Sequence, residues 1–173
     1  MARVFSGPLS VHYAQAYLLP AESVTPDLKE CFRGQVNGLC GAALPGKLFL
    51  ITGLHTGHVG FTVDLLDAPP PLDDTWEEVV EVPFSVTASE TALVEWAGSA
   101  TYPIPLPRGS FRARYCARGM QLGKDLDTSP PDVLPIDSYS LTFWPAQTTG
   151  DSVLRVTSEI AAYFHQKAHM LRF

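Results

Sequence analysis

The stretch from residue 76 to residue 120 alternates apolar and polar residues with a period of two. Such alternation gives each strand one buried face and one wet face, as in an antiparallel sheet. In its first strand, Val80, Val82 and Phe84 share the apolar face with Trp76. Glu78 is the one polar residue on that face, and we expect little burial there because it begins the strand. The stretch predicts a β-meander.

Three prolines stand two residues apart inside this stretch, at Pro103, Pro105 and Pro107. Backbone N–H groups point to alternate sides along a strand, so prolines at this spacing remove the donors of one side only. A segment of this kind pairs on one side at most. We therefore expect an edge strand or an extended segment that resists unwanted pairing.

The last strand of the stretch alternates apolar residues with a basic stripe made of Arg108, Arg112, Arg114 and Arg118. We expect these arginines to pair with carboxylates on neighbouring strands, at Glu77, Glu81 or Glu95, with anion binding as the alternative. Cys116 lies on the same face. Nearby positive charge there would lower the pKa of its thiol and raise its reactivity, whereas burial would leave it inert.

The length of 173 residues and the hydrophobic content of 46% predict one globular domain over residues 1–173. The formal net charge of −6 argues against direct nucleic-acid binding and is compatible with a basic partner. Three cysteines without a repeated spacing do not form a disulfide framework. With no signal peptide and no apolar run of membrane-spanning length, we expect reduced thiols in a cytoplasmic protein.

The remaining elements are predicted from local hydrophobic patterns and from the residues that begin or end helices and strands. Residues 9–19 read as the first strand, and the segment 22–32 contains one helical turn begun near Asp27. Short strands at 47–52 and 59–66 flank a glycine-containing turn, which predicts a hairpin.

The C-terminal third is predicted to contain a long surface loop, a strand and a helix. The loop covers 121–135, because charged residues and prolines alternate there. A strand follows over 137–144. A helix is expected at about 157–169, capped by Thr157 or Ser158.

Together these elements predict an all-β fold, an antiparallel two-sheet β-sandwich with one C-terminal α-helix. A β-barrel is the alternative.

Four segments, read in order, resemble the competence protein J family, whose members are inhibitors of a DNA-entry nuclease. They are Leu9-Ser-Val-His-Tyr, Val80-Glu-Val-Pro-Phe, Leu106-Pro-Arg-Gly-Ser and Asp137-Ser-Tyr-Ser-Leu. These are packing and turn residues, and the segments that carry the resemblance cover about half of the chain. The resemblance implies a β-sandwich that binds a nuclease or another basic protein without being an enzyme. The long 121–135 loop and the C-terminal helix are departures from the family pattern.

An acidic cluster surrounds Trp76 in sequence and supplies the candidate partner-binding residues. Those candidates are Asp73, Asp74, Trp76, Glu77 and Glu81. In an inhibitor of a basic nuclease, carboxylates imitate nucleic-acid phosphates and steer association, and a tryptophan is a natural anchor. The alternative is a solvated acidic loop beside a core tryptophan.

The alternative function is binding of a small ligand or carbohydrate, with Trp144, Trp96 and Tyr102 as stacking platforms. A third possibility is a metal site on His55 and His58, but no third ligand is marked, so a solvated turn is the favoured interpretation. No nucleophile elbow, phosphate-binding loop or dinucleotide motif is present in the sequence. We therefore expect no catalytic residues and no cofactor.

Overall fold

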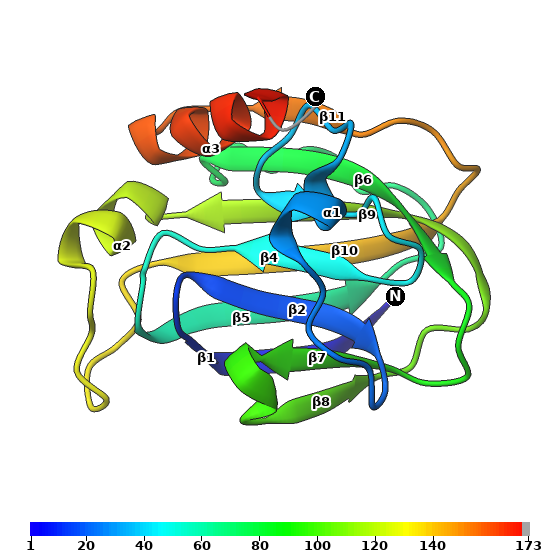
Figure 1. Ribbon diagram of the computed structural model, residues 1–173, viewed down its shortest axis with the longest axis horizontal. Coiled ribbons are helices and arrows are strands. Elements are labelled where there is room, and N and C mark those ends of the chain that lie inside the picture. Colours follow the sequence, from blue (N-terminus) through cyan, green and yellow to red (C-terminus); the bar gives the residue numbers. More distant parts are fainter. Residues whose placement is uncertain (171–173) are drawn as a thin grey trace.

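The computed structural model describes residues 1–170, so the last three residues of the predicted 1–173 domain lie outside the described part. Two β-sheets pack face to face, and three α-helices lie around them (Figure 1). Sheet A contains β1 (Ala2–Val11), β5 (Gly57–Leu65), β6 (Glu78–Val86), β9 (Gly109–Arg118), β10 (Ser138–Pro145) and β11 (Ser152–Arg155). Sheet B contains β2 (Gln15–Pro20), β3 (Cys40–Gly41), β4 (Leu48–Ile51), β7 (Thr91–Glu95) and β8 (Thr101–Ile104).

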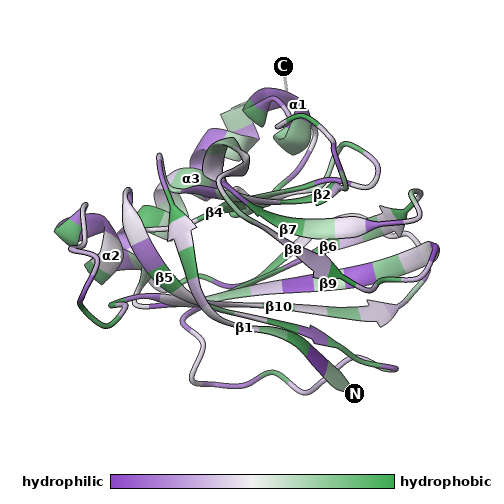
Figure 2. Cartoon of the chain, turned by 90° about the horizontal axis from the view of Figure 1, so that it is seen from below, coloured by the Kyte–Doolittle hydropathy of each residue, from purple (hydrophilic) through white to green (hydrophobic). Residues whose placement is uncertain are grey.

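The strand order is β1-β5-β10-β9-β6-β11 in sheet A and β3-β4-β2-β7-β8 in sheet B. All pairs are antiparallel except β5 and β10, which run parallel. The helices are α1 (Leu28–Phe32), α2 (Met120–Leu126) and α3 (Glu159–Met170), and a short 3-10 turn, η1 (Trp96–Gly98), follows β7. Figure 2 shows the two layers, with β2, β7 and β8 on one side and β1, β9 and β10 on the other.

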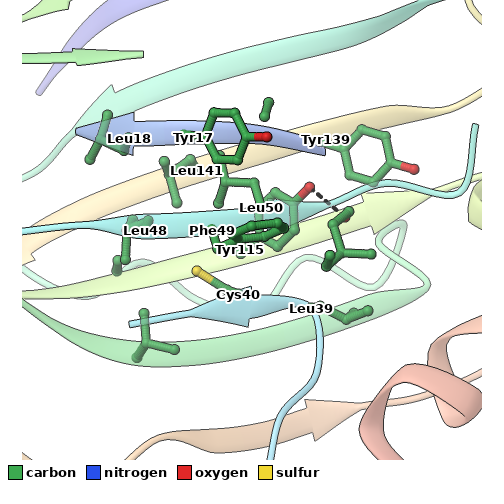
Figure 3. Close-up of a cluster of buried hydrophobic side chains, with 14 of the residues drawn as sticks. Tyr17, Leu18, Leu39, Cys40, Leu48, Phe49, Leu50, Tyr115, Tyr139 and Leu141 are labelled. Atoms are coloured by element: carbon green, nitrogen blue, oxygen red, sulfur yellow. Dashed lines mark hydrogen bonds between the residues drawn. The ribbon is translucent and has the colours of Figure 1, made fainter. Parts of the chain in front are cut away.

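The core lies between the sheets and receives the apolar face of each strand. Tyr115 and Tyr139 stack there with ring centroids 5.7 Å apart, and the Tyr115 hydroxyl donates to the Ile51 carbonyl at 2.9 Å (Figure 3). The alternation of β6 is as expected, because Val80, Val82 and Phe84 are all buried. Each aromatic hydroxyl in the core thus has a partner, which removes the cost of burying it.

The prediction of a two-sheet sandwich is confirmed, and no barrel forms among the described residues. The prediction of a β-meander is wrong. Strand β6 pairs with β9 in sheet A, whereas β7 pairs with β8 in sheet B. The chain therefore crosses from one sheet to the other twice within the stretch that the sequence presents as one motif.

Two further pairings differ from the expectation. The segment 9–19 is not one strand, because Tyr13 and Ala14 adopt positive φ angles and turn the chain from β1 in sheet A to β2 in sheet B. The hairpin expected from 47–52 and 59–66 does not form either, since β4 belongs to sheet B and β5 to sheet A. A pattern of two short strands around a turn does not reveal whether they pair with each other.

Several local expectations are confirmed. Strand β8 lies at the edge of sheet B, where the prolines were expected to place it. The Asp27 carboxylate accepts from the Glu30 N–H and caps α1. Helix α3 occupies Glu159–Met170, and the Ser158 hydroxyl accepts from the Ala161 N–H at 3.2 Å.

The segment expected as a loop over 121–135 begins with helix α2, and only the part after Leu126 is loop. Strand β11 was not expected at all; it extends sheet A beyond β6.

Glu78 is fully buried, contrary to the expectation of a half-exposed strand start. Its carboxylate accepts from the N–H of Thr157 at 3.1 Å and of Ser158 at 2.8 Å, and from the Thr157 hydroxyl at 2.9 Å. The C-terminal segment therefore covers the start of β6, and the donors just before α3 compensate the buried charge.

Candidate functional site

A groove runs across the outer face of sheet A, on the side that does not face sheet B. It consists of two adjoining hollows, of about 840 Å³ and about 300 Å³, which share Arg3, Thr62 and Trp76 as lining residues. Strands β1, β5 and β10 form its floor, and the segments 70–76 and 131–135 form its walls. The larger hollow lies in the size range of ligand-binding clefts.

Small polar side chains cover the floor. Gly60 and the hydroxyl residues leave the sheet surface low between the two walls. The floor hydroxyls belong to Ser6, Thr62, Ser138, Ser140 and Thr142. Within residues 1–170, none of these hydroxyls makes a hydrogen bond. They are therefore available to a bound molecule.

The walls carry large apolar side chains. On one wall, the half-buried Trp76 packs against the Arg118 guanidinium, whose carbon lies 4.5 Å from the ring centroid. On the other wall, Leu134 is 91% exposed and Val133 is 49% exposed. Apolar residues that rim a hollow in this way are typical of interaction sites.

The charges of the groove are partly matched. Arg3 forms a two-pronged ion pair with Asp64, at 2.9 Å and 3.0 Å. Arg114 lines the smaller hollow and pairs with Glu81. Asp73 and Asp132 also line the groove, both are exposed, and neither forms an ion pair within the described chain.

The predicted acidic cluster separates into partly buried and exposed members. Glu81 lies between Arg112 and Arg114, at 3.2 Å and 2.9 Å, with its charge neutralised on the sheet surface. The Glu77 carboxylate accepts from the Gly119 N–H at 2.8 Å. The two Glu81 ion pairs are the cross-strand pairing predicted for the basic stripe, whereas Glu77 bonds the backbone of Gly119 and no arginine.

Asp73 and Asp74 are the members that face solvent. Hydrogen bonds from Thr75 hold the pKa of Asp73 below its ordinary value. Asp74 is 97% exposed at its side chain and pairs with Arg155 at 3.1 Å. Arg155 also donates to the Trp76 carbonyl at 2.7 Å, which fixes the wall of the groove.

Cys116 is the buried thiol that was the favoured of the two expectations. It is buried beneath the 70–76 segment, and burial raises the pKa of its thiol to about 12 despite the nearby Arg114. All three cysteines are free, as expected. Desolvation outweighs the neighbouring positive charge here, because the thiolate would lose its hydration on this covered face.

The three predicted stacking residues lie in different places. Trp144 is buried on the outer face of β10, under the Arg114 guanidinium at 5.1 Å. The Tyr102 ring packs on Phe5 at 4.8 Å, and its hydroxyl donates to Glu95 at 3.2 Å. Trp96 belongs to an aromatic cluster with His12 and Tyr13, at 4.8 Å and 5.5 Å.

His55 and His58 are not brought together as a metal site. His55 joins the aromatic cluster, with its ring 5.2 Å from Tyr13, and its Nδ1 lies 2.8 Å from the Thr56 hydroxyl. His58 lines the larger hollow of the groove. Among residues 1–170, no group of three or more potential ligands is arranged to hold a metal ion.

The sequence interpretation singled out Trp76, Asp73 and His58 among the lining residues but missed the floor and the 131–135 wall. Ser138, Ser140 and Thr142 alternate on one face of the last strand, which indicated an outward polar face. Nothing local showed that the 131–135 segment would fold over this face, because a wall is a contact between distant parts of the chain.

The comparison with solved structures bears on this fold. The crystal structure of ComJ, inhibitor of the DNA-degrading activity of NucA from Bacillus subtilis, matches 84% of this chain and 98% of its own, with a TM-score of 0.56. The fold is ComJ-like. The sequence identity to ComJ is 18%, so the likeness concerns the fold alone and confirms the resemblance expected from the sequence.

A second solved structure, described as Crocagin biosynthetic gene J, matches 85% of this chain and all of its own, with a TM-score of 0.50 and 14% identity. No protein-family profile and no curated protein sequence matches the chain. No helix within residues 1–170 is both long and apolar enough to cross a bilayer.

Proposed function

We propose that this protein is a non-enzymatic inhibitor that binds a nuclease and covers its active site. The ComJ-like fold over most of the chain carries the proposal, since ComJ is described as an inhibitor of a DNA-degrading activity. The formal net charge of −6 suits a partner whose nucleic-acid site is basic.

The proposed contact residues are Asp73, Asp74, Trp76, Glu77 and Glu81. Within this set, Asp73 and Asp74 supply exposed negative charge, and Trp76 supplies a ring at the groove. Glu77 and Glu81 position the 70–76 segment and the arginine-bearing strand. Exposed charges of this kind act mainly on the association rate.

The first test is capture of partners by the tagged protein from its native extract, followed by mass spectrometry and a DNA-cleavage assay. We expect a nuclease in near-equal amount whose cleavage is suppressed. Capture of no nuclease, or of one that cleaves at its full rate in the complex, would contradict the proposal.

The contact assignment is tested with a triple variant, Asp73→Asn, Asp74→Asn and Glu77→Gln. The amides retain hydrogen-bond acceptors, so the fold is preserved while charge is lost. We expect association with the nuclease to slow about tenfold at low salt. The matched control is Glu22→Gln, Glu90→Gln and Asp125→Asn, which removes three exposed charges outside the 70–76 segment and should bind as the wild type does.

A further inference from the structure

We propose that the groove on the outer face of sheet A holds an extended segment of the partner protein that carries a basic residue next to an apolar one. This proposal rests on the protein-binding function proposed above and names the part of the partner that is bound. Four properties of the groove carry it: its shape, its floor, its walls and its unmatched charge.

The shape suits a chain better than a compact ligand. The two hollows meet at Arg3, Thr62 and Trp76 and continue from the 131–135 wall to the segment at Pro70 and Pro71. The two hollows thus adjoin in one elongated site, and an extended chain advances about 3.3 Å per residue. Several consecutive residues would therefore lie in it side by side with the floor strands.

Along β5 and β10, the floor offers side-chain hydroxyls, and not the edge of a strand, for hydrogen bonds to a bound segment. Strand β5 lies between β1 and β10, and β10 lies between β5 and β9, so both edges of each strand are already paired. A bound segment cannot join the sheet at β5 or β10; of the three floor strands, only β1 lies at an edge of sheet A. Instead, Thr62, Ser138 and Ser140 present hydroxyls with no partner in residues 1–170, and a hydroxyl both donates to a carbonyl and accepts from an N–H.

The walls provide the apolar contact. Trp76 offers one ring face to the groove while Arg118 lies against the ring, which holds its orientation. Leu134 belongs to the 131–135 wall of the same hollow and is almost fully exposed. An apolar side chain bound in this hollow would shield apolar surface of the walls from water, and tryptophan is enriched among the residues that dominate binding energy.

The unmatched charge selects a basic residue. Among the arginines of the lining, Arg3 is paired with Asp64, and Arg114 shares Glu81 with Arg112. Asp73 on one wall and Asp132 on the other remain exposed without an ion pair in the described chain. A lysine or arginine of the bound segment would supply the missing partner.

The test is selection of random linear peptides, displayed on phage, against the immobilised wild-type protein. We expect enriched peptides to carry a basic residue beside an apolar one. Thr62→Trp fills the middle of the groove and should weaken their binding at least tenfold. Thr101→Trp, a control at an exposed position on the edge of sheet B, should leave it unchanged.

The charge requirement is tested separately with Asp73→Asn and Asp132→Asn together, which should weaken the selected peptides several-fold and lower the salt dependence of their binding. Thermal melting of each variant verifies that it is folded. If no peptides are enriched, or if they bind Thr62→Trp as tightly as the wild type, the groove is not a docking site for an extended segment.

These outcomes separate this proposal from the inhibitor function. Groove-dependent peptide binding without capture of a nuclease would support the groove and remove the inhibitor function. Inhibition of a captured nuclease that Thr62→Trp leaves intact would support the inhibitor and remove the groove as its contact.

Discussion

Tyr13 and Ala14 form the two-residue turn between β1 and β2 with φ angles of 54° and 58°. Two positive φ angles in succession are the mark of a turn that favours Asn-Gly. Residues with a side chain adopt this region at a cost of about 1 kcal/mol or more each. The turn is held by backbone bonds from Ala14 to the 52–55 segment, and it brings the Tyr13 ring against Trp96.

Replacing Ala14 with glycine should therefore stabilise the protein. We expect Ala14→Gly to raise the free energy of unfolding by about 0.5–1 kcal/mol, because glycine adopts a positive φ without steric cost. Urea denaturation monitored by tryptophan fluorescence measures the change. Ala21→Gly, at an exposed turn position where φ is not positive, is the control and should be neutral or destabilising. A loss of stability in Ala14→Gly would show that the positive φ angle of Ala14 does not strain the folded protein.

At the scale of elements, a single carboxylate joins α3 to sheet A. Glu78 at the start of β6 accepts hydrogen bonds from Thr157 and Ser158, immediately before the helix begins at Glu159. Negative charge near a helix N-terminus is favourable, because the first backbone N–H groups lack partners inside the helix. The same hydrogen bonds thus satisfy the buried Glu78 carboxylate and hold the start of α3 against sheet A.

Removal of this carboxylate should loosen the helix and destabilise the whole protein. We expect Glu78→Ala to lower the free energy of unfolding by about 3 kcal/mol, since it removes the buried carboxylate that accepts several hydrogen bonds from Thr157 and Ser158. Glu78→Gln keeps one acceptor and should cost less. Glu90→Ala, at an exposed acidic position, should change stability by less than about 0.5 kcal/mol. Equal stability of Glu78→Ala and Glu90→Ala would contradict the role given to Glu78.

At the scale of the molecule, α3 is also tied to the loop that precedes β3. The Gly38 N–H donates to His165 Nδ1 at 2.9 Å, and a Cβ at Gly38 would lie 1.9 Å from the Phe164 carbonyl oxygen. The Asp151 carboxylate accepts from the N–H of Val36 and Asn37 in the same loop, at 2.9 Å and 2.8 Å. Segments more than a hundred residues apart thus meet beside sheet B.

This junction makes stability depend on pH. Burial lowers the pKa of His165 below its ordinary value of 6.5, against the opposite effect of Asp151, and the acceptor Nδ1 requires the neutral ring. A lowered folded-state pKa means that the unfolded chain binds the proton first. The contribution of His165 is therefore fully present above pH 6.5 and is lost as the pH falls through the lowered pKa.

We expect the free energy of unfolding to fall between neutral and mildly acidic pH, and His165→Asn, which keeps an acceptor near Gly38, to reduce that dependence. Denaturation curves across this pH range provide the measurement. Because burial raises the pKa of Asp137, that carboxylate acts in the opposite sense, and the comparison of wild type with variant isolates His165. An unchanged pH dependence in the variant would show that His165 does not control it.

Many secondary-structure features of this protein could be predicted from local sequence patterns. The alternation in β6, β9 and β10, the prolines at the edge strand β8, and the cap of α3 were all found from the sequence, because each depends on residues within a few positions of one another. The same patterns led to the sandwich and to the resemblance that the comparison with ComJ supports at the level of the fold.

The partners of the strands were decided only by the tertiary structure. Strands β4 and β5 follow each other closely yet belong to different sheets, and β5 pairs with β10, from a distant part of the chain. Likewise, Trp76 and the 131–135 segment line the same hollow although they lie more than 50 residues apart in the sequence. Periodicity assigns a face to each residue, but pairing and the groove depend on packing energies between distant segments, which no local pattern encodes.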